Sequence, residues 1–407
     1  MYNNINLFTQ ALGIKAPWKL DKVNFDKENG QLDIHISHKR GSKFPCPKCG
    51  HKCSIHDTRE RTWRHLNFFQ YKAYIHSKVP RIKCEEHGVL QVETPWSRPG
   101  SGFTMLFEAF IVELATVMTV NEISNLVSEH DTRLWRILKH YVDQARDKEE
   151  YSNTKAIGID ETSSKKGHNY ITLFVDLDKS KIIYATEGKD SSTVDSFALN
   201  LKLHQGDPKN IKKICCDMSP AFKKGSRENF PKAEITFDKF HVMKIVNKAV
   251  DQVRRDEQID NRELKKTRYI WLKNPENLTK KQKEKLSSLS EMNSKTIRAY
   301  NLKLSFQELW DIEDLTTASS FLQKWYSWAI RSQLEPMVEV ARFVNRHWQG
   351  IIHYIKSHIN NGILEGLNSI VQTIKRKARG FRNTDNFITA IYLQCGKLQF
   401  DLPKAFI

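Results

Sequence analysis

The sequence has little proline and glycine and lacks a long apolar run. Of its 407 residues, 12 are proline and 17 are glycine, whereas hydrophobic residues make up 39% and charged residues 28%. This composition excludes a collagen-like chain, a mostly disordered chain and a disulfide-stabilised miniprotein. The length predicts two or three globular domains.

No segment is apolar enough to suggest a membrane span. The most hydrophobic stretch, residues 103–118, contains Glu108 and Glu113, and a span needs about 20 predominantly apolar residues. The N-terminus also lacks the basic region and continuous apolar region of a secretory signal. We therefore expect a cytoplasmic protein without a membrane role.

Cysteine is scarce and unevenly distributed. Four of the seven cysteines, Cys46, Cys49, Cys53 and Cys84, lie in the first quarter of the chain. An odd number of cysteines in a reducing compartment favours metal ligands and buried thiols over a disulfide framework.

Acidic residues are too few to balance the basic ones. The chain carries 65 lysines and arginines against 47 aspartates and glutamates, which gives a formal net charge of +18. A surplus of this size favours a polyanionic partner or an anionic membrane surface. Because no membrane role is expected, nucleic acid is the predicted partner.

The hydrophobic pattern of the first third changes from strand-like to helical. From about residue 20 to 94, short apolar and basic runs alternate, which predicts small strands around the cysteines. A cluster of Pro, Gly and Ser at 94–102 is the predicted linker. From Phe103 to about residue 148 the apolar spacing predicts three successive helices.

Strand-like runs return after Thr154. A helical segment at 194–203 and five apolar runs predict an α/β sheet; the runs lie at 156–160, 170–178, 182–188, 211–217 and 233–238. From 241 to about 343 the pattern is helical and very basic, which indicates a helical insertion. The final helix, 363–375, is predicted to form an apolar stripe from Ile363, Leu367, Ile370 and Ile374.

Two short motifs have the spacing of metal-binding knuckles, Cys46-Pro-Lys-Cys49-Gly and Cys84-Glu-Glu-His87-Gly. Tetrahedral zinc needs four soft or borderline ligands brought together from two turns. We therefore predict one structural Zn²⁺ bound by Cys46, Cys49, Cys84 and His87. Buried cysteines without metal are the alternative, and the nearby side chains that could replace a ligand are His51, Cys53 and His56.

A helix-turn-helix motif is predicted between residues 119 and 143. The segment TVNEISNLV is followed by SEH and then by DTRLWRILKHYV, and Asp131 or Thr132 could cap the last helix. A recognition helix from Thr132 to about Tyr141 would offer DNA three basic side chains, Arg133, Arg136 and Lys139. A plain three-helix packing unit is the alternative.

Two carboxylates end apolar runs. Asp160 follows AIGI and Asp217 follows ICC, so both are expected at the ends of sheet strands. A carboxylate that closes a hydrophobic strand is costly unless it is paired or binds a cation, and both are therefore candidate metal ligands. Carboxylates that cap a neighbouring helix would explain the same pattern.

The final helix offers a third carboxylate, Glu365, on the side opposite the predicted apolar stripe. This polar face could offer a carboxylate to a metal and basic groups to a phosphate chain, and it also carries Asn368, Ser369, Gln372 and Arg376. A solvated helix face is the simpler alternative.

In their order and over nearly the whole chain, these motifs resemble the ISL-three family of bacterial insertion-sequence transposases. The resemblance rests on the CPxCG module, the helix-turn-helix, GIDE, CCDMSPAF, FDKFHV and the EGLN…IKRKARGF ending. It implies an RNase H-like catalytic domain whose DDE triad falls on Asp160, Asp217 and Glu365. The FDKFHV segment, with Asp238 and His241, resembles the DxxH signature of related transposases.

The resemblance predicts a multidomain α+β fold. Its parts would be a β-rich zinc-binding domain, a helix-turn-helix DNA-binding domain, and an RNase H-like α/β catalytic core interrupted by a helical insertion. The predicted boundaries are 1–94 for the zinc domain, 95–150 for the helix-turn-helix, 151–242 and 346–407 for the two parts of the core, and 243–345 for the insertion.

A DDE triad would bind two Mg²⁺ ions, because hard oxygen ligands suit that ion and two-metal sites promote attack on a phosphodiester. Glu161 leaves open which of two adjacent carboxylates binds metal. Residues considered as support for the site are Glu161, Asp238, His241 and Asn368. The basic residues expected to contact DNA phosphates are Lys375, Arg376, Lys377, Arg379 and Arg382.

The predicted function is a DNA transposase that binds the ends of its insertion sequence, cleaves them and joins them to target DNA. Its partner would be double-stranded DNA, both terminal inverted repeats and target, and the active complex a homodimer or larger assembly associated with the bacterial nucleoid. The rival hypotheses are a zinc-containing DNA-binding regulator with an inert catalytic domain, and an RNase H-class nuclease without strand transfer.

Overall fold

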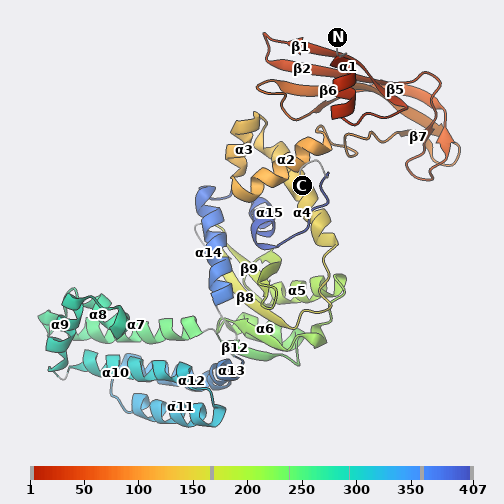
Figure 1. Ribbon diagram of the computed structural model, residues 1–407. Coiled ribbons are helices and arrows are strands. Elements are labelled where there is room, and N and C mark those ends of the chain that lie inside the picture. The colour runs from red at the N-terminus through yellow and green to blue at the C-terminus, as the bar shows by residue number, and fades with distance from the viewer. Residues whose placement is uncertain (1–3, 166–168, 238, 293, 358–361, 404–407) are drawn as a thin grey trace. The chain divides into compact units, whose positions relative to one another are not determined.

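The computed structural model describes residues 4–165, 169–237, 239–292, 294–357 and 362–403 (Figure 1). The chain forms two compact units. One comprises the residues up to Ala145 together with the segment from Gln399, and the other comprises Arg146–Leu398. Among the described residues, no helix is both long and apolar enough to cross a membrane.

The first unit begins with a short helix and a mixed β-sheet. Along β2 and the first half of β6 buried and partly buried side chains alternate, because successive side chains of a strand point to opposite faces. The helix, α1, was not predicted, whereas the strands confirm the predicted β-rich module. The elements are α1 (Asn4–Ala11), β1 (Trp18–Asp26), β2 (Gln31–His38), β3 (Phe44–Pro45), β4 (Lys52–Cys53), β5 (Ile55–Arg64), β6 (Lys72–Cys84) and β7 (Gly88–Gln91).

The sheet has the strand order β1-β2-β6-β5, with β7 paired to β6. The β2–β6 pair is parallel, and the neighbouring pairs are antiparallel. The short strands β3 and β4 form a separate antiparallel ladder. The long strand β6 therefore joins the sheet to the two cysteine-containing turns, since it ends at Cys84.

Three helices follow, as predicted: α2 (Met105–Val117), α3 (Val120–Val127) and α4 (Asp131–Asp147). Thr119 and Glu122 form a capping box at the start of α3, which satisfies two backbone donors that the helix itself cannot pair. The predicted cap of the last helix is wrong. Asp131 and Thr132 both lie inside α4, and the amide of Thr132 donates to Nδ1 of His130 at 3.3 Å.

The segment 94–102, predicted as a linker, is folded instead. Trp96 lies in the hydrophobic core of the β-rich module. The guanidinium of Arg98 and the hydroxyls of Ser101 and Tyr141 donate to the buried carboxylate of Glu108. A buried charge needs such partners, and the polar residues of this segment supply them.

The second unit contains a five-stranded sheet of the order β10-β9-β8-β11-β12. Strands β8, β9 and β10 are antiparallel neighbours, and β11 is parallel to both β8 and β12. All five predicted apolar runs form strands, namely β8 (Ala156–Ser163), β9 (Tyr170–Asp176), β10 (Lys181–Glu187), β11 (Lys213–Cys216) and β12 (Glu234–Phe237).

One face of this sheet forms a core with α5 (Ser191–Leu203) and α6 (Pro220–Asn229). Ile157 and Ile159 of β8 are buried there beside Phe197 and Phe222. Gly158, between these two isoleucines, faces the other side and lies against Leu364 of α14 (Gly362–Lys377). The helix α15 (Thr384–Cys395) follows α14, and the hydroxyl of Tyr392 accepts a hydrogen bond from the amide of Ala185 in the edge strand β10 (2.8 Å).

The predicted apolar stripe of the last-but-one helix, α14, is wrong in its register. Leu364, Val371 and Ile374 are the buried residues, whereas Ile370 is 44% exposed. A run of several apolar residues in one helix allows more than one stripe, and the contact with Gly158 selects the one that contains Leu364.

The predicted insertion, 243–345, lies within a helical region from α7 to α13 that has its own core. It leaves the sheet directly after β12 and returns to β12 through α13, where Gly350 lies against the ring of Phe237. Its helices are α7 (Lys239–Glu257), α8 (Arg268–Leu272), α9 (Lys280–Ser290), α10 (Lys295–Glu308), α11 (Leu315–Ile330), α12 (Glu335–Arg346) and α13 (Trp348–Ser357). Short 3₁₀ turns lie at Pro208–Asn210, Arg262–Leu264, Pro275–Asn277 and Leu309–Asp311.

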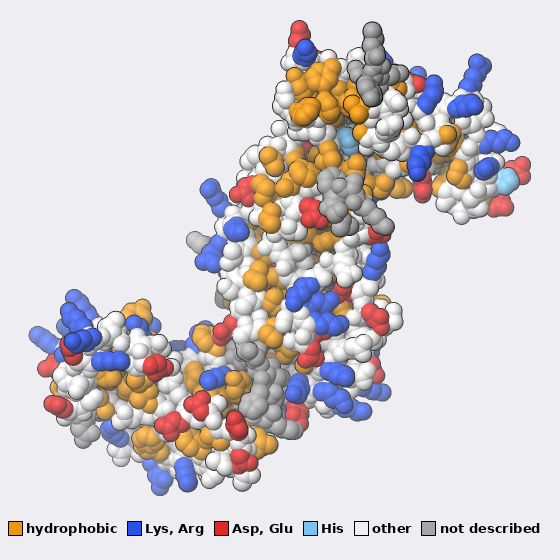
Figure 2. All heavy atoms as spheres, in the orientation of Figure 1, with side chains coloured by type: hydrophobic (Ala, Val, Ile, Leu, Met, Phe, Trp, Pro, Cys, Tyr) orange, Lys and Arg blue, Asp and Glu red, His pale blue; other side chains and the backbone are white. Residues whose placement is uncertain are grey.

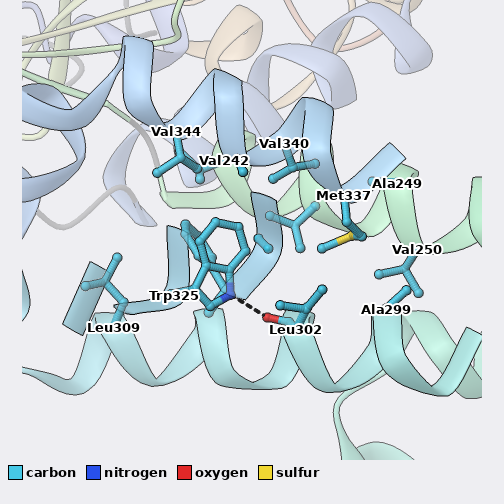
Figure 3. Packing of buried hydrophobic residues seen from close by; sticks show 14 of the residues in the cluster. Val242, Ala249, Val250, Ala299, Leu302, Leu309, Trp325, Met337, Val340 and Val344 are labelled. Carbon is cyan, nitrogen blue, oxygen red and sulfur yellow. Dashed lines mark hydrogen bonds between the residues drawn. The ribbon is translucent and has the colours of Figure 1, made fainter. Parts of the chain in front are cut away.

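Trp325 lies at the centre of the insertion core (Figure 3). Its indole N–H donates to the backbone carbonyl of Leu302 at 2.8 Å, and Met337 and Val340 of α12 belong to the same buried cluster. Trp328, on the same helix, is 46% exposed.

Trp325→Ala should lower the free energy of unfolding of the insertion by about 3–5 kcal/mol, because it leaves a large cavity in the core. The matched variant Trp328→Ala should cost less than about 1 kcal/mol. Urea unfolding followed by circular dichroism measures both, and equal losses in the two variants would contradict this description of the core.

Candidate active site and zinc cluster

The two cysteine-containing motifs come together in the first unit. One ligand atom from each of Cys46, Cys49, Cys84 and His87 lies within 4.8 Å of all the others. The sulfur atoms of Cys49 and Cys84 are 3.7 Å apart, as are the sulfur of Cys84 and Nδ1 of His87. Tetrahedral Zn–S bonds of about 2.3 Å place ligand atoms about 3.7 Å apart, so the cluster has the dimensions of a zinc site.

The local backbone explains why each knuckle carries a glycine. Gly50 and Gly88 have φ angles of 74° and 70°, a left-handed conformation that glycine adopts without steric cost. The amide of Gly50 donates to the carbonyl of Cys46 at 2.8 Å. These tight turns bring the side chains of each motif to one point.

The other candidate ligands lie outside this cluster. The thiol of Cys53 donates to the carbonyl of His51 at 3.4 Å, and the side chains of His51 and His56 are exposed. The described residues contain one group of metal-ligand side chains of this compactness.

The predicted DNA-contacting residues of α4 differ in their surroundings. Arg136 and Lys139 are exposed on the helix. Arg133 is already engaged, because its guanidinium pairs with Glu129 and lies 4.2 Å from the centroid of the Phe103 ring.

Sequence reasoning missed Arg64, a buried arginine at the end of β5. Its Nε lies 3.6 Å from Oε1 of Glu129, in the turn between α3 and α4. Its guanidinium also lies over the rings of Tyr74 and Phe107. Arg64 therefore joins the β-rich module to the helix-turn-helix within the first unit. No periodic pattern distinguishes such an arginine from a solvated one, so the sequence offered no signal for it.

In the second unit, Asp160 and Asp217 occupy matching positions on neighbouring strands. Strands β8 and β11 are parallel, and Ile159 pairs with Cys216. Each aspartate is the next residue of its chain, and adjacent strands lie about 4.8 Å apart. Asp160 lies on the Gly158 face of β8, since residues that alternate along a strand share a face, and Asp217 directly follows the last residue of β11.

Helix α14 lies over this face of β8. The Nδ2 group of Asn368 donates to Oδ2 of Asp160 at 2.9 Å. Two further side chains of the same helix row reach β8: Gln372 donates to the hydroxyl of Thr162, and Nζ of Lys375 donates to the carbonyl of Ser163 at 2.6 Å.

Glu365 lies one turn before Asn368 on α14, in the same row of side chains. It is exposed. Asp160, Asp217 and Glu365 thus belong to three elements that meet around one face of the sheet. The Oδ1 atom of Asp217 also accepts a hydrogen bond from the amide of Ser219 at 2.8 Å, directly before α6. This contact is of the kind that the helix-capping alternative predicts.

Glu161 follows Asp160 on β8 and lies near Asp217. Partial burial and the nearby charge of Asp217 raise the pKa of Glu161, whereas Lys189 and His241 lower it. His241 and Glu161 are therefore close enough to interact, although they lie 80 positions apart in the sequence. Asp238, the other predicted member of this group, lies outside the described residues.

The basic residues after Glu365 also differ from one another. Lys375 is bound to the backbone of β8. The others are exposed at and beyond the end of α14, namely Arg376, Lys377, Arg379 and Arg382.

Comparison with known proteins agrees with this organisation. A transposase family model of ISL3 matches residues 157–391, the helix-turn-helix domain of transposase family ISL3 matches 92–142, and the zinc-finger of transposase IS204/IS1001/IS1096/IS1165 matches 42–87. The transposase for insertion sequence element IS1557 from Mycobacterium tuberculosis is 25% identical over 439 residues, which covers 98% of this chain and 97% of the relative. The transposase for insertion sequence element IS1001 from Bordetella parapertussis is 25% identical over 398 residues, with 94% and 96% covered.

The fold and these matches define a DNA transposase with a zinc-finger domain and a helix-turn-helix domain. The chain belongs to the ISL3 family of transposases, as its motifs predicted.

Cys84→Ser should remove the bound zinc and unfold the β-rich module, because structural zinc supplies folding free energy to small domains. Cys53→Ser is the matched control and should retain one zinc per chain. Elemental analysis and circular dichroism report both effects. A zinc-free protein whose sheet is intact would contradict the assignment.

Proposed function

We propose that this transposase cleaves and joins DNA by a DDE mechanism in which Asp160, Asp217 and Glu365 bind the catalytic metal ions. The observation that supports this proposal most directly is the register of the parallel strands β8 and β11, in which Ile159 pairs with Cys216, the residues directly before Asp160 and Asp217. The hydrogen bond from Asn368 to Asp160 supports the placement of α14, and with it Glu365, over that face.

The residues present fit a divalent cation with hard oxygen ligands. Asp160 and Asp217 follow paired residues of β8 and β11, Glu365 lies on α14, which packs on β8, and Oδ1 of Asn368 is buried without a hydrogen-bond partner among the described residues. Oxygen ligands of this kind suit Mg²⁺. When bound, two Mg²⁺ ions would activate the attacking water or 3′-hydroxyl and stabilise the leaving oxygen.

The residues of the chain have separate tasks in this proposal. Asp160 and Asp217 hold the ions from the sheet, and Glu365 closes the site from α14. Glu161 and His241 flank it on the side of Lys189, where His241 would orient a phosphate. Asp238 is proposed for the same group on its sequence motif.

We also propose an RNase H-like core, supported by the mixed sheet in which β8 carries Asp160 and the parallel strand β11 ends directly before Asp217. The insertion at 243–345 would separate the two parts of this core, 151–242 and 346–407. The zinc domain would occupy 1–94 and the helix-turn-helix 95–150, in agreement with the two smaller family matches. The zinc ligands would be Cys46, Cys49, Cys84 and His87.

The proposed substrates are the terminal inverted repeats of an insertion sequence and a target duplex, in the bacterial nucleoid. Arg136 and Lys139 would contact the repeat, with Arg133 holding the turn of the motif. Figure 2 shows further Lys and Arg side chains over the α8–α9 end of the insertion, where exposed lysines include Lys280, Lys281, Lys283 and Lys285. A homodimer or larger assembly would bring two ends together.

Two other functions would use the same fold. A regulator with an inert catalytic domain would bind DNA but not cleave it with Mg²⁺, and an RNase H-class nuclease would cleave without strand transfer. The clustered carboxylates favour the first proposal over the regulator, and the family favours it over the nuclease.

Single replacement of Asp160, Asp217 or Glu365 by Ala should abolish Mg²⁺-dependent cleavage of a terminal-repeat duplex and leave binding of that duplex largely intact. The exposed carboxylate of Asp178, in the turn after β9, provides the control Asp178→Ala, which should cleave normally. Full cleavage by any of the three variants would remove that residue from the triad.

Replacement of Arg376, Lys377, Arg379 and Arg382 by Gln should weaken DNA binding and flatten its dependence on salt. Each lost phosphate contact lowers the slope of log K against log salt by roughly one unit. Lys375→Gln should leave the slope unchanged, because this ammonium is bound to Ser163. Binding to a terminal-repeat duplex across a salt series distinguishes phosphate contacts from a solvated basic tail, for which no slope would change.

A further inference from the structure

The amide of Asn368 has one satisfied end and one unsatisfied end. Its Nδ2 group donates to Oδ2 of Asp160 at 2.9 Å, whereas its Oδ1 atom is buried without a hydrogen-bond partner in the described residues. A carboxylate accepts hydrogen bonds and donates none when ionised. The NH₂ group must therefore face Asp160, which leaves the carbonyl oxygen directed elsewhere.

The carboxylate of Asp160 is held by two donors on different oxygens. Oδ2 accepts from Asn368, and Oδ1 accepts from the amide of Glu161 at 2.8 Å. Two such donors fix the plane of the carboxylate, which is what a metal ligand of defined geometry requires.

Seating α14 on the sheet does not depend on Asn368 alone. Leu364 packs against Gly158, Gln372 bonds to Thr162, and Lys375 bonds to Ser163. Of the three polar contacts between this helix row and β8, only the one from Asn368 ends on a carboxylate. Asn368 is therefore the side chain that contacts Asp160, whereas other side chains of α14 hold the helix against the sheet.

We propose that Asn368 is a fourth member of the metal site: its NH₂ group orients Asp160, and its Oδ1 atom is a neutral oxygen ligand for the cation bound by Asp160 and Asp217. This inference rests on the proposed DDE function. A neutral amide oxygen adds a ligand without adding charge repulsion between the carboxylates, which a fourth acidic residue at this position would do.

The test is the affinity of the full-length, zinc-loaded protein for Mn²⁺, measured by electron paramagnetic resonance in the absence of DNA. Asn368→Ala and the volume-conserving Asn368→Leu should both weaken Mn²⁺ binding by about 10–100-fold, the range found for residues that orient metal ligands.

Gln372→Ala is the matched control. It removes the next hydrogen bond between α14 and β8 but touches no carboxylate, so its Mn²⁺ affinity should equal that of the unaltered protein. Circular dichroism shows whether each variant is folded. If Asn368→Ala does not fold, the Mn²⁺ affinity of Asn368→Leu still tests the inference.

The variant Asp160→Ala distinguishes a failure of the inference on Asn368 from a failure of the proposed DDE metal site. If Asp160→Ala loses Mn²⁺ binding while both Asn368 variants bind normally, the inference on Asn368 is overturned and the DDE proposal stands. If the Asn368 and Gln372 variants lose affinity equally, Asn368 only seats the helix and the inference is again overturned. Unchanged Mn²⁺ affinity in Asp160→Ala would overturn the metal site itself.

Discussion

The close contact between α14 and β8 is the constraint on which the candidate active site depends. Asp160 and Asn368 lie 208 positions apart in the chain, yet they form a direct hydrogen bond. Gly158 permits this, because a Cβ atom at that position would lie 2.4 Å from Cδ2 of Leu364. The polar row of α14 then runs along β8 from Asp160 to Ser163. Without this contact, the carboxylate of α14 would have no fixed relation to the two carboxylates of the sheet.

The helical insertion does not disturb the contact between α14 and β8, because the insertion folds around a separate hydrophobic core. Its core closes around Trp325, and both of its ends meet the edge strand β12. Here α7 follows β12 directly, and α13 packs back against it with Gly350 on Phe237. Connecting two nearby points by a long segment costs little additional loop-closure entropy. The chain can therefore place many residues between Asp217 and Glu365 while both remain attached to one sheet.

The sequence predicted what local patterns determine. Each strand of the second unit was visible as an apolar run. The carboxylates that ended two of these runs were expected at strand ends, which is correct for Asp217, directly after β11, but wrong for Asp160, because β8 continues to Ser163 through its pairing with β9. The zinc cluster was visible in two short motifs. Tertiary contacts decided the rest: Leu364 rather than Ile370 faces the sheet because of Gly158, and Trp96 is buried in a segment whose Pro, Gly and Ser content predicted a linker. Arg64 gave no signal, since its partner Glu129 belongs to a distant turn.

The claim that most of this account depends on is that Asp160, Asp217 and Glu365 bind the same metal ions. Crystals of the transposase with its terminal-repeat DNA, soaked in Mn²⁺, would show the ions directly by anomalous diffraction. We predict two anomalous peaks about 3.5–4 Å apart, within coordination distance of all three carboxylates. Peaks bound by Glu161 and His241, with Glu365 directed to solvent, would contradict the account.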